Sequence, residues 1–138
     1  MIPHQATCIA IGGRALLIEG PPGCGKSSLA LALIDRGAVL IGDDSVLLEA
    51  QHGRLVAHPH PNTRGLLEVR NVGLISLPVC ESAPVALALL LDKAAPRHIE
   101  AADQVERGGV AVPMLRLWPA SPILHLKAEL ALERFGLS

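Results

Sequence analysis

One stretch of the chain, residues 20–27, carries the pattern of a phosphate-binding loop. It reads G-P-P-G-C-G-K-S and fits G-x-x-x-x-G-K-[ST] without a mismatch. In such a loop backbone N–H groups converge on phosphate oxygens, the lysine reaches the β- and γ-phosphates, and the last hydroxyl can ligate Mg²⁺. We therefore expect a nucleoside triphosphate as the ligand. The expected binding residues are Gly20, Pro21, Pro22, Gly23, Cys24, Gly25, Lys26, Ser27 and Ser28.

The segments on either side of this loop favour the same interpretation. Residues 15–18 form an apolar run typical of a buried strand, and residues 28–34 form a helical one whose N-terminus would face the phosphates. We expect the helix to end at residues 35–37, where Gly37 can take the left-handed conformation of a C-terminal cap. A glycine-rich connection without a ligand is the alternative, but it leaves the charge of Lys26 unexplained.

Two adjacent carboxylates, Asp43 and Asp44, follow the next expected strand, residues 39–41. The end of a strand is where ligands bind in open α/β sheets. Because side chains alternate along a strand, the two carboxylates cannot both face one substrate, and we expect unequal roles for them. A solvated turn after the strand is the alternative.

Length and composition favour one ordinary domain, residues 1–138. The formal net charge is −1 and no lysine/arginine cluster is present, which disfavours nucleic acid or an anionic membrane as a partner. The longest aliphatic run, residues 85–91, is far shorter than the roughly 20 residues that span a bilayer. No charged segment precedes an apolar one at the N-terminus, so we expect a cytoplasmic protein.

Cysteine and histidine spacing indicates neither disulfides nor zinc. Cys8, Cys24 and Cys80 are odd in number and widely separated, so we expect three reduced thiols. Cys24 could act as a redox switch within the loop, but we favour a small side chain at a variable position. Residues 58–62, His-Pro-His-Pro-Asn, are predicted to form a loop, and the His-x-His pair has no third ligand at a suitable spacing.

The remaining patterns predict further strands and a second helix. We expect hairpins over residues 7–11 and 15–19 and over residues 45–49 and 54–57. We also expect strands over 64–70, 72–75 and 110–113, a buried central strand over 85–91, and a loop over 94–107. The last helix is expected to start at Ser121 and Pro122 and to stop at Gly136 after Phe135. Its expected apolar face consists of Ile123, Leu124, Leu126, Leu130 and Ala131.

These features together resemble the catalytic domain of the HPr kinase/phosphorylase family. The resemblance is carried by His4, the phosphate loop, Asp35-Arg36-Gly37, residues 40–46 (LIGDDSV) and residues 67–75 (LEVRNVGLI). It is closest to the short versions that lack a separate N-terminal domain. It implies an α/β P-loop nucleotide-binding fold with a mixed central sheet, similar in its core to phosphoenolpyruvate carboxykinase.

The resemblance also implies an activity and roles for individual residues. The family transfers the γ-phosphoryl group of ATP to a serine of HPr, the phosphocarrier of a phosphotransferase system, and can reverse this by phosphorolysis. By resemblance, Asp43 is the catalytic base, assisted by Lys26, and His4 lies near the acid pair. Ser27, Asp44 and Glu68 would hold Mg²⁺. The family forms homo-hexamers.

Three departures bear on this interpretation. Ser28 stands where the family usually has Glu or Asp, and Asn71 replaces a glycine. Residues 118–122 do not match the Pro-Gly-Arg segment that the family uses for phosphorolysis and for contact with HPr. Kinase chemistry is therefore better supported than phosphorolysis. The alternatives are a P-loop kinase for a small molecule or another protein, and a nucleotide-binding regulator with weak catalysis whose C-terminal helix mediates assembly.

Overall fold

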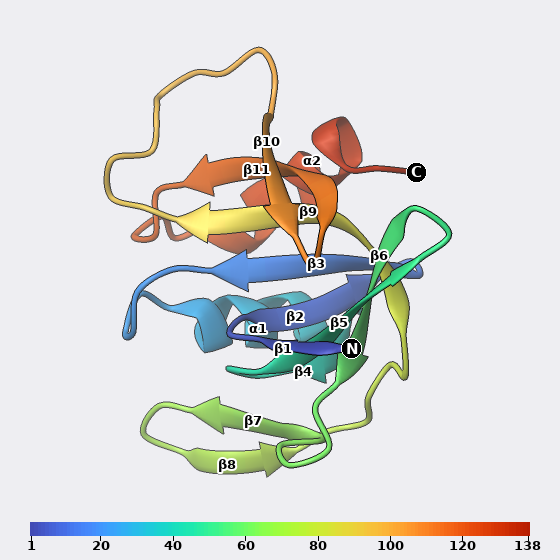
Figure 1. Cartoon of the computed structure of the whole chain (residues 1–138). Helices are drawn as coiled ribbons and strands as arrows, with labels where there is room; N and C mark the ends of the chain where they lie inside the picture. The colour runs from blue at the N-terminus through green and yellow to red at the C-terminus, as the bar shows by residue number, and fades with distance from the viewer.

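Three adjacent parallel strands form the centre of the molecule in this computed structural model, which describes residues 1–138 (Figure 1). They are β3 (Arg14–Glu19), β9 (Ala83–Leu91) and β11 (Val110–Leu117). The middle strand, β9, pairs in parallel with β3 and with the second half of β11. It is aliphatic and mostly buried because both faces of the sheet are covered. The carboxyl ends of the three strands meet at one edge of the sheet, as the arrowheads in Figure 1 show.

Antiparallel strands extend this sheet and make it mixed. β2 (Thr7–Ile11) pairs with β3, β4 (Val39–Gly42) pairs with β2, and β10 (Asp103–Arg107) pairs with the first half of β11. The turn between β2 and β3 is made by Gly12 and Gly13, whose φ angles of 56° and 83° suit a two-residue hairpin. The expected α/β fold with a mixed central sheet is confirmed.

Three further strands curl over one face of the central sheet. β1 (Ile2–His4), β5 (Val46–Gln51) and β6 (Arg54–Pro59) pair antiparallel in the order β1-β5-β6, and β6 joins the beginning of β9. Because the end of β9 pairs with β11 instead, the sheet divides at this strand. The space between the two parts is filled by a core of buried side chains that includes Leu17 and Leu48.

The two helices, α1 (Lys26–Asp35) and α2 (Leu124–Phe135), cover the opposite face. Each contributes buried apolar residues to a second core, among them Leu33 of α1 and Leu132 of α2. As expected, α1 ends at Gly37, which has a φ of 107°. Backbone N–H groups of residues 37 and 38 bond the carbonyls of residues 34 and 33, the hydrogen-bond pattern of a glycine C-cap. Neither helix is long and apolar enough to cross a bilayer.

A separate two-stranded hairpin lies beside α1, at the bottom of Figure 1. It consists of β7 (Leu66–Val69) and β8 (Gly73–Ser76), which pair only with each other. Both strands were expected, although as part of a sheet edge. Leu67 is fully buried in the core beneath the helices, so it anchors the hairpin and fixes the direction of its neighbour Glu68.

Two strand predictions were wrong. Residues 94–107 were expected to be a loop, but Asp103–Arg107 form β10, whose mostly charged and half-exposed residues give no apolar period. β11 runs on to Leu117, beyond Pro113, because its pairing with β9 begins at Met114. In addition, His58 and Pro59 lie inside β6 rather than in a loop, and His58 pairs with Glu49.

The second helix starts later than predicted, and the face that it buries matches the expected one only at Leu124 and Ala131. It begins at Leu124, since Ser121 caps a preceding turn in which its Oγ accepts a bond from Ile123 N. The buried positions are Leu124, Ala128, Ala131 and Leu132. Ile123 and Leu130, placed on the apolar face by the sequence, are 48% and 64% exposed.

Candidate functional site

The phosphate-binding loop joins the carboxyl end of β3 to the N-terminus of α1. In this structure Lys26 Nζ donates to the carbonyls of Gly20 at 2.9 Å and Pro21 at 3.1 Å, so the ammonium group lies over the loop main chain. No side chain caps the N-terminus of α1, and its first turn holds no acidic residue. The positive end of the helix dipole and its free N–H groups therefore face an anion-binding position.

Gly20 is required by packing at the start of the loop. A Cβ atom there would come within 2.7 Å of Cys24 Sγ and 3.2 Å of the Leu91 carbonyl. The loop backbone thus packs directly on the end of β9, which sets where the phosphate-binding N–H groups lie.

A polar pocket of about 250 Å³ opens beside the loop, and none of its lining residues is hydrophobic. It brings together five of the predicted side chains: Lys26, Ser27, Asp43, Asp44 and Glu68. Its remaining lining residues are Pro22, Gly23, Gly25, Ser28 and Arg70. Three of the expected ligand-binding loop residues, Gly20, Pro21 and Cys24, lie outside this pocket.

Asp43 is the most highly connected residue of the polar pocket. Its Oδ1 accepts hydrogen bonds from Ser27 Oγ at 2.7 Å and from Thr7 Oγ1 at 3.0 Å, and its Oδ2 accepts one from Glu68 N at 3.0 Å. These bonds tie β4 to α1, β2 and β7 around a carboxylate that is 8% exposed. Asp44, in contrast, is exposed and has a φ of 67°. The two acids therefore differ in their surroundings, and the unequal roles expected for them stay a prediction.

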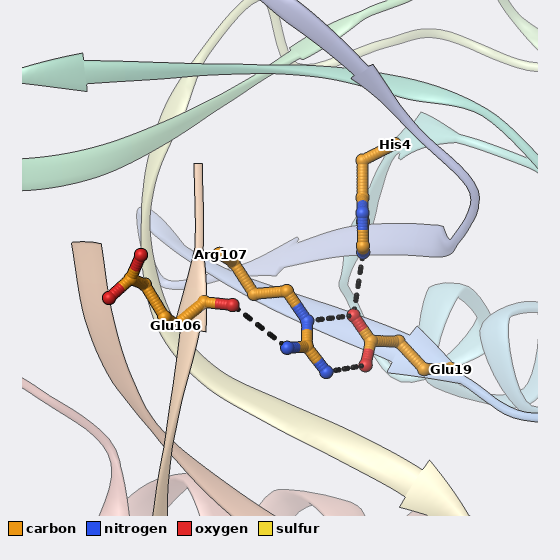
Figure 2. A network of polar contacts seen from close by, with 4 residues as sticks. All are labelled: His4, Glu19, Glu106 and Arg107. Carbon is orange, nitrogen blue, oxygen red and sulfur yellow. Dashed lines mark hydrogen bonds and ion pairs between the residues drawn. The ribbon is translucent and has the colours of Figure 1, made fainter. Parts of the chain in front are cut away.

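His4 lies outside the polar pocket, in a second polar cluster (Figure 2). Its Nε2 is 2.6 Å from Oε2 of Glu19, and no hydrogen bond joins it to Asp43 or Asp44. Arg107 holds the same carboxylate with two bonds, from Nε at 2.9 Å and from Nη2 at 2.7 Å. We call His4, Glu19 and Arg107 the Glu19 cluster.

The Glu19 cluster fixes the residue that directly precedes the loop. Glu19 is only 9% exposed, and burial opposes its ionisation, but the hydrogen bonds from His4 and Arg107 outweigh this and lower its pKa to about 2. The charged carboxylate therefore links the end of β3 to β1 and β10 (Figure 2). The same end of β3 leads into Gly20, whose carbonyl accepts the Lys26 bond.

The sequence reasoning missed Glu19, Arg107 and Thr7 and gave Arg70 no role. One signal for Glu19 was available, since it is a charge that ends a buried aliphatic strand directly before the loop. Thr7 offered none, because a threonine at a strand end is common and its partner Asp43 is distant in sequence.

The donors in the polar pocket suit a magnesium ion that arrives with a nucleotide. No group of three or more His, Cys, Asp or Glu residues is arranged to hold a metal ion. Ser27, Asp44 and Glu68 offer one hydroxyl and two carboxylates around the pocket. Mg²⁺ commonly keeps several waters and uses one or two carboxylates together with substrate phosphates, so this donor set fits it.

Comparison with known proteins identifies the family. The family model for the HPr Serine kinase C-terminal domain matches residues 2–80. The chain belongs to this family. The matched range contains the phosphate loop, the acid pair and β7 of this chain. The resemblance seen in the motifs is therefore confirmed.

Curated relatives of this chain are named HPr kinase/phosphorylase. The protein from Streptococcus gordonii is 35% identical over an alignment of 120 residues that covers 78% of this chain and 39% of the relative. The protein from Mycoplasma mycoides is 29% identical over an alignment of 109 residues that covers 74% of this chain and 35% of the relative. The chain thus spans little more than a third of the length of these relatives.

The fold also matches a solved structure. The HPr(Ser) kinase/phosphatase from Coxiella burnetii superimposes with a TM-score of 0.82 at 25% identity, over 96% of this chain and 95% of that one. The similarity therefore extends past residue 80 to β9, β10, β11 and α2, the part of the chain where the motifs are weakest.

Proposed function

We propose that this chain is an ATP-dependent serine kinase domain that transfers the γ-phosphoryl group of ATP to an HPr-like phosphocarrier protein. The observation that carries the proposal is the polar pocket. It places a P-loop lysine, a P-loop serine, two aspartates and a glutamate around the N-terminus of one helix, in a chain of the HPr Serine kinase C-terminal domain family.

Phosphate binding comes first in the proposed reaction. The γ- and β-phosphates lie against the loop N–H groups, and Lys26 exchanges its bonds to the Gly20 and Pro21 carbonyls for bonds to phosphate. Ser27, Asp44 and Glu68 hold Mg²⁺, which neutralises part of the phosphate charge when it is bound. All three residues line the pocket into which the loop opens.

Asp43 accepts the proton of the acceptor serine. The serine oxygen forms a bond to the γ-phosphorus, the bond from that phosphorus to the bridging oxygen breaks, ADP leaves, and the proton passes to Asp43. Three fixed donors hold the carboxylate, and they leave its Oδ2 with capacity for one more hydrogen bond. A base held in this way needs little rearrangement when the serine arrives.

His4 supports the reaction from a distance in this proposal. Because it contacts Glu19 rather than the acid pair, its role is to position the end of β3 before the loop.

The acceptor reaches the pocket from the side of Asp44, which is exposed. Val72 and Leu74 of the β7–β8 hairpin are 69% and 67% exposed, and Leu74 is the cross-strand partner of Glu68, so apolar surface suited to a protein acceptor adjoins the pocket.

A transfer assay tests the proposal. Purified chain, Mg·ATP and HPr from the same organism should yield phosphoserine on HPr, detected by peptide mass spectrometry, and the yield should depend on Mg²⁺. Tight ATP binding without phosphoserine on HPr would contradict the acceptor and favour a nucleotide-binding regulator. Absence of ATP binding would contradict the kinase assignment itself. The assembly of the chain into homo-oligomers can be measured on the same sample by light scattering.

A further inference from the structure

A second cavity, of about 640 Å³, adjoins the phosphate-binding loop, and Asp43 is not among its lining residues. Its walls come from three places: the loop itself, the end of β9 and the segment between β11 and α2. The loop contributes Cys24, β9 contributes Leu90 and Leu91, and the last segment contributes Pro119 and Ala120. Because these three segments follow or end β3, β9 and β11, the cavity lies at the carboxyl ends of three adjacent parallel strands, where ligands bind in α/β sheets. We call it the side cavity.

The side cavity adjoins the polar pocket at Gly23, which lines both. The two spaces differ in chemistry. The polar pocket is small and has no hydrophobic wall, which suits phosphate groups and a metal ion. The side cavity is larger and has apolar walls, with Asp92 and Lys93 as its charged residues, and it falls within the size range of small-molecule sites.

We propose that the side cavity binds the purine base and ribose of the nucleoside triphosphate whose phosphates occupy the polar pocket. The inference rests on the proposed function for the identity of that ligand. The apolar walls of the side cavity would shield the flat base from water. The charged phosphates would lie in the polar pocket, which shares Gly23 with the side cavity. Asp92 lies at the cavity wall, where a carboxylate can accept hydrogen bonds from ribose hydroxyls.

Ala120 offers a direct way to fill the cavity. It is exposed in the segment between β11 and α2 and lines the side cavity but not the polar pocket. Ala120→Trp should raise the Kd for Mg·ATP about tenfold or more and leave the Kd for inorganic triphosphate within about twofold. Ala101→Trp, at an exposed position outside both spaces, is the matched control and should change neither Kd.

Cys24 provides a second measurement that needs no catalysis. In the Cys80→Ser variant it is the accessible thiol, because Cys8 is buried and burial raises its pKa. ATP should slow alkylation of Cys24 by iodoacetamide, whereas inorganic triphosphate, which has no base, should leave the rate nearly unchanged. Mass spectrometry of the tryptic peptide gives the rate.

The outcomes separate this inference from the proposed function. Selective loss of ATP affinity in Ala120→Trp, with ATP-specific protection of Cys24, supports the side cavity as the nucleoside site. Equal effects on ATP and triphosphate, or none, would overturn the inference while the kinase assignment stands. If the unaltered chain binds neither compound, the proposed function fails, and the inference fails with it.

Discussion

The Ser27 hydroxyl donates a 2.7 Å hydrogen bond to Asp43 Oδ1, so the residue that ends the phosphate-loop motif is tied to the first aspartate of the acid pair. The bond joins the N-terminus of α1 to the end of β4. It sets the direction of the Ser27 lone pairs, which are the groups offered to Mg²⁺, and it uses one acceptor site of the proposed base. Metal binding and proton acceptance are therefore linked through one contact.

This link predicts the behaviour of Ser27 variants. Ser27→Ala removes a proposed metal ligand and the bond to Asp43, so the Mg²⁺ concentration for half-maximal transfer should rise and the maximal rate should fall. Ser27→Thr keeps a hydroxyl at the same place and should retain most of the activity. Mg²⁺ titration of single-turnover transfer measures both effects. If the alanine variant behaves like the threonine variant, Ser27 is not a metal ligand.

Lys26→Ala should slow transfer strongly while leaving the fold intact. The ammonium group bonds two loop carbonyls and lies on the protein surface rather than in a core. Loss of one charged group that stabilises the transition state typically costs about 10²–10³ in rate. The urea midpoint should change little. Lys127→Ala, at an exposed position on α2, is the control and should keep full activity.

Arg107→Met should destabilise the protein by about 2–3 kcal/mol, because it removes the bidentate partner of a nearly buried carboxylate while His4 remains. The pH dependence has a definite sign. The folded-state pKa of Glu19 is lowered to about 2, so its ion pairs stabilise the native state above the ordinary glutamate pKa, and this contribution is lost as the pH falls toward 2.

Urea unfolding of both proteins between about pH 7 and pH 2.5 tests this prediction. The difference in stability should be largest near neutral pH and should shrink in the acidic part of the range. Arg116→Met is the control, since its contacts with Asp92 and Asp103 are 3.6 and 3.8 Å long and exposed, and it should cost less than about 1 kcal/mol. A stability difference for Arg107→Met that does not vary with pH would contradict the ionised Glu19.

Phosphorolysis should be slow compared with the kinase reaction. The segment after β11, residues 118–122, lacks the arginine that the family places in its Pro-Gly-Arg segment, and Trp118 there is half exposed. Incubation of phospho-HPr with inorganic phosphate and Mg²⁺ should therefore release pyrophosphate at a small fraction of the forward rate. Comparable forward and reverse rates would show that another residue, with Arg70 in the pocket as the first candidate, replaces the missing arginine.

Local signals in the sequence were enough to predict the elements around the loop. The loop motif, the helix that follows it and its glycine cap at Gly37 depend on neighbouring residues only. The continuous aliphatic run of β9 likewise marks a strand that is buried on both faces. In the structure Lys26, Ser27 and Asp43 line one pocket.

Long-range contacts could not be predicted in the same way. Glu19 and Arg107 are 88 residues apart, and Arg107 lies on a polar strand without a clear period. The orientation of α2 also depends on what it packs against, because both Leu130 and Leu132 are leucines and only the sheet decides which is buried. The motif likewise gave no sign that Thr7 would bond Asp43.

The proposed role of Asp43 as the proton acceptor is tested by Asp43→Asn. An asparagine can still accept the Ser27 and Thr7 bonds, but its amide group would face the Glu68 N–H, so a loss of about 1–3 kcal/mol in stability is expected. Asp44→Asn, at the exposed neighbour, is the matched comparison for stability and should cost little.

The decisive measurement is single-turnover phosphoryl transfer to HPr at saturating Mg·ATP, made beside an ATP titration of each variant. Asp43→Asn should keep its Mg·ATP affinity within a few fold and lose about 10²–10⁴ in transfer rate, since only the transition state uses the base. Glu68→Gln should instead require more Mg²⁺. If Asp43→Asn loses ATP affinity but transfers at the normal rate once it is saturated, Asp43 binds the metal or the nucleotide and is not the proton acceptor.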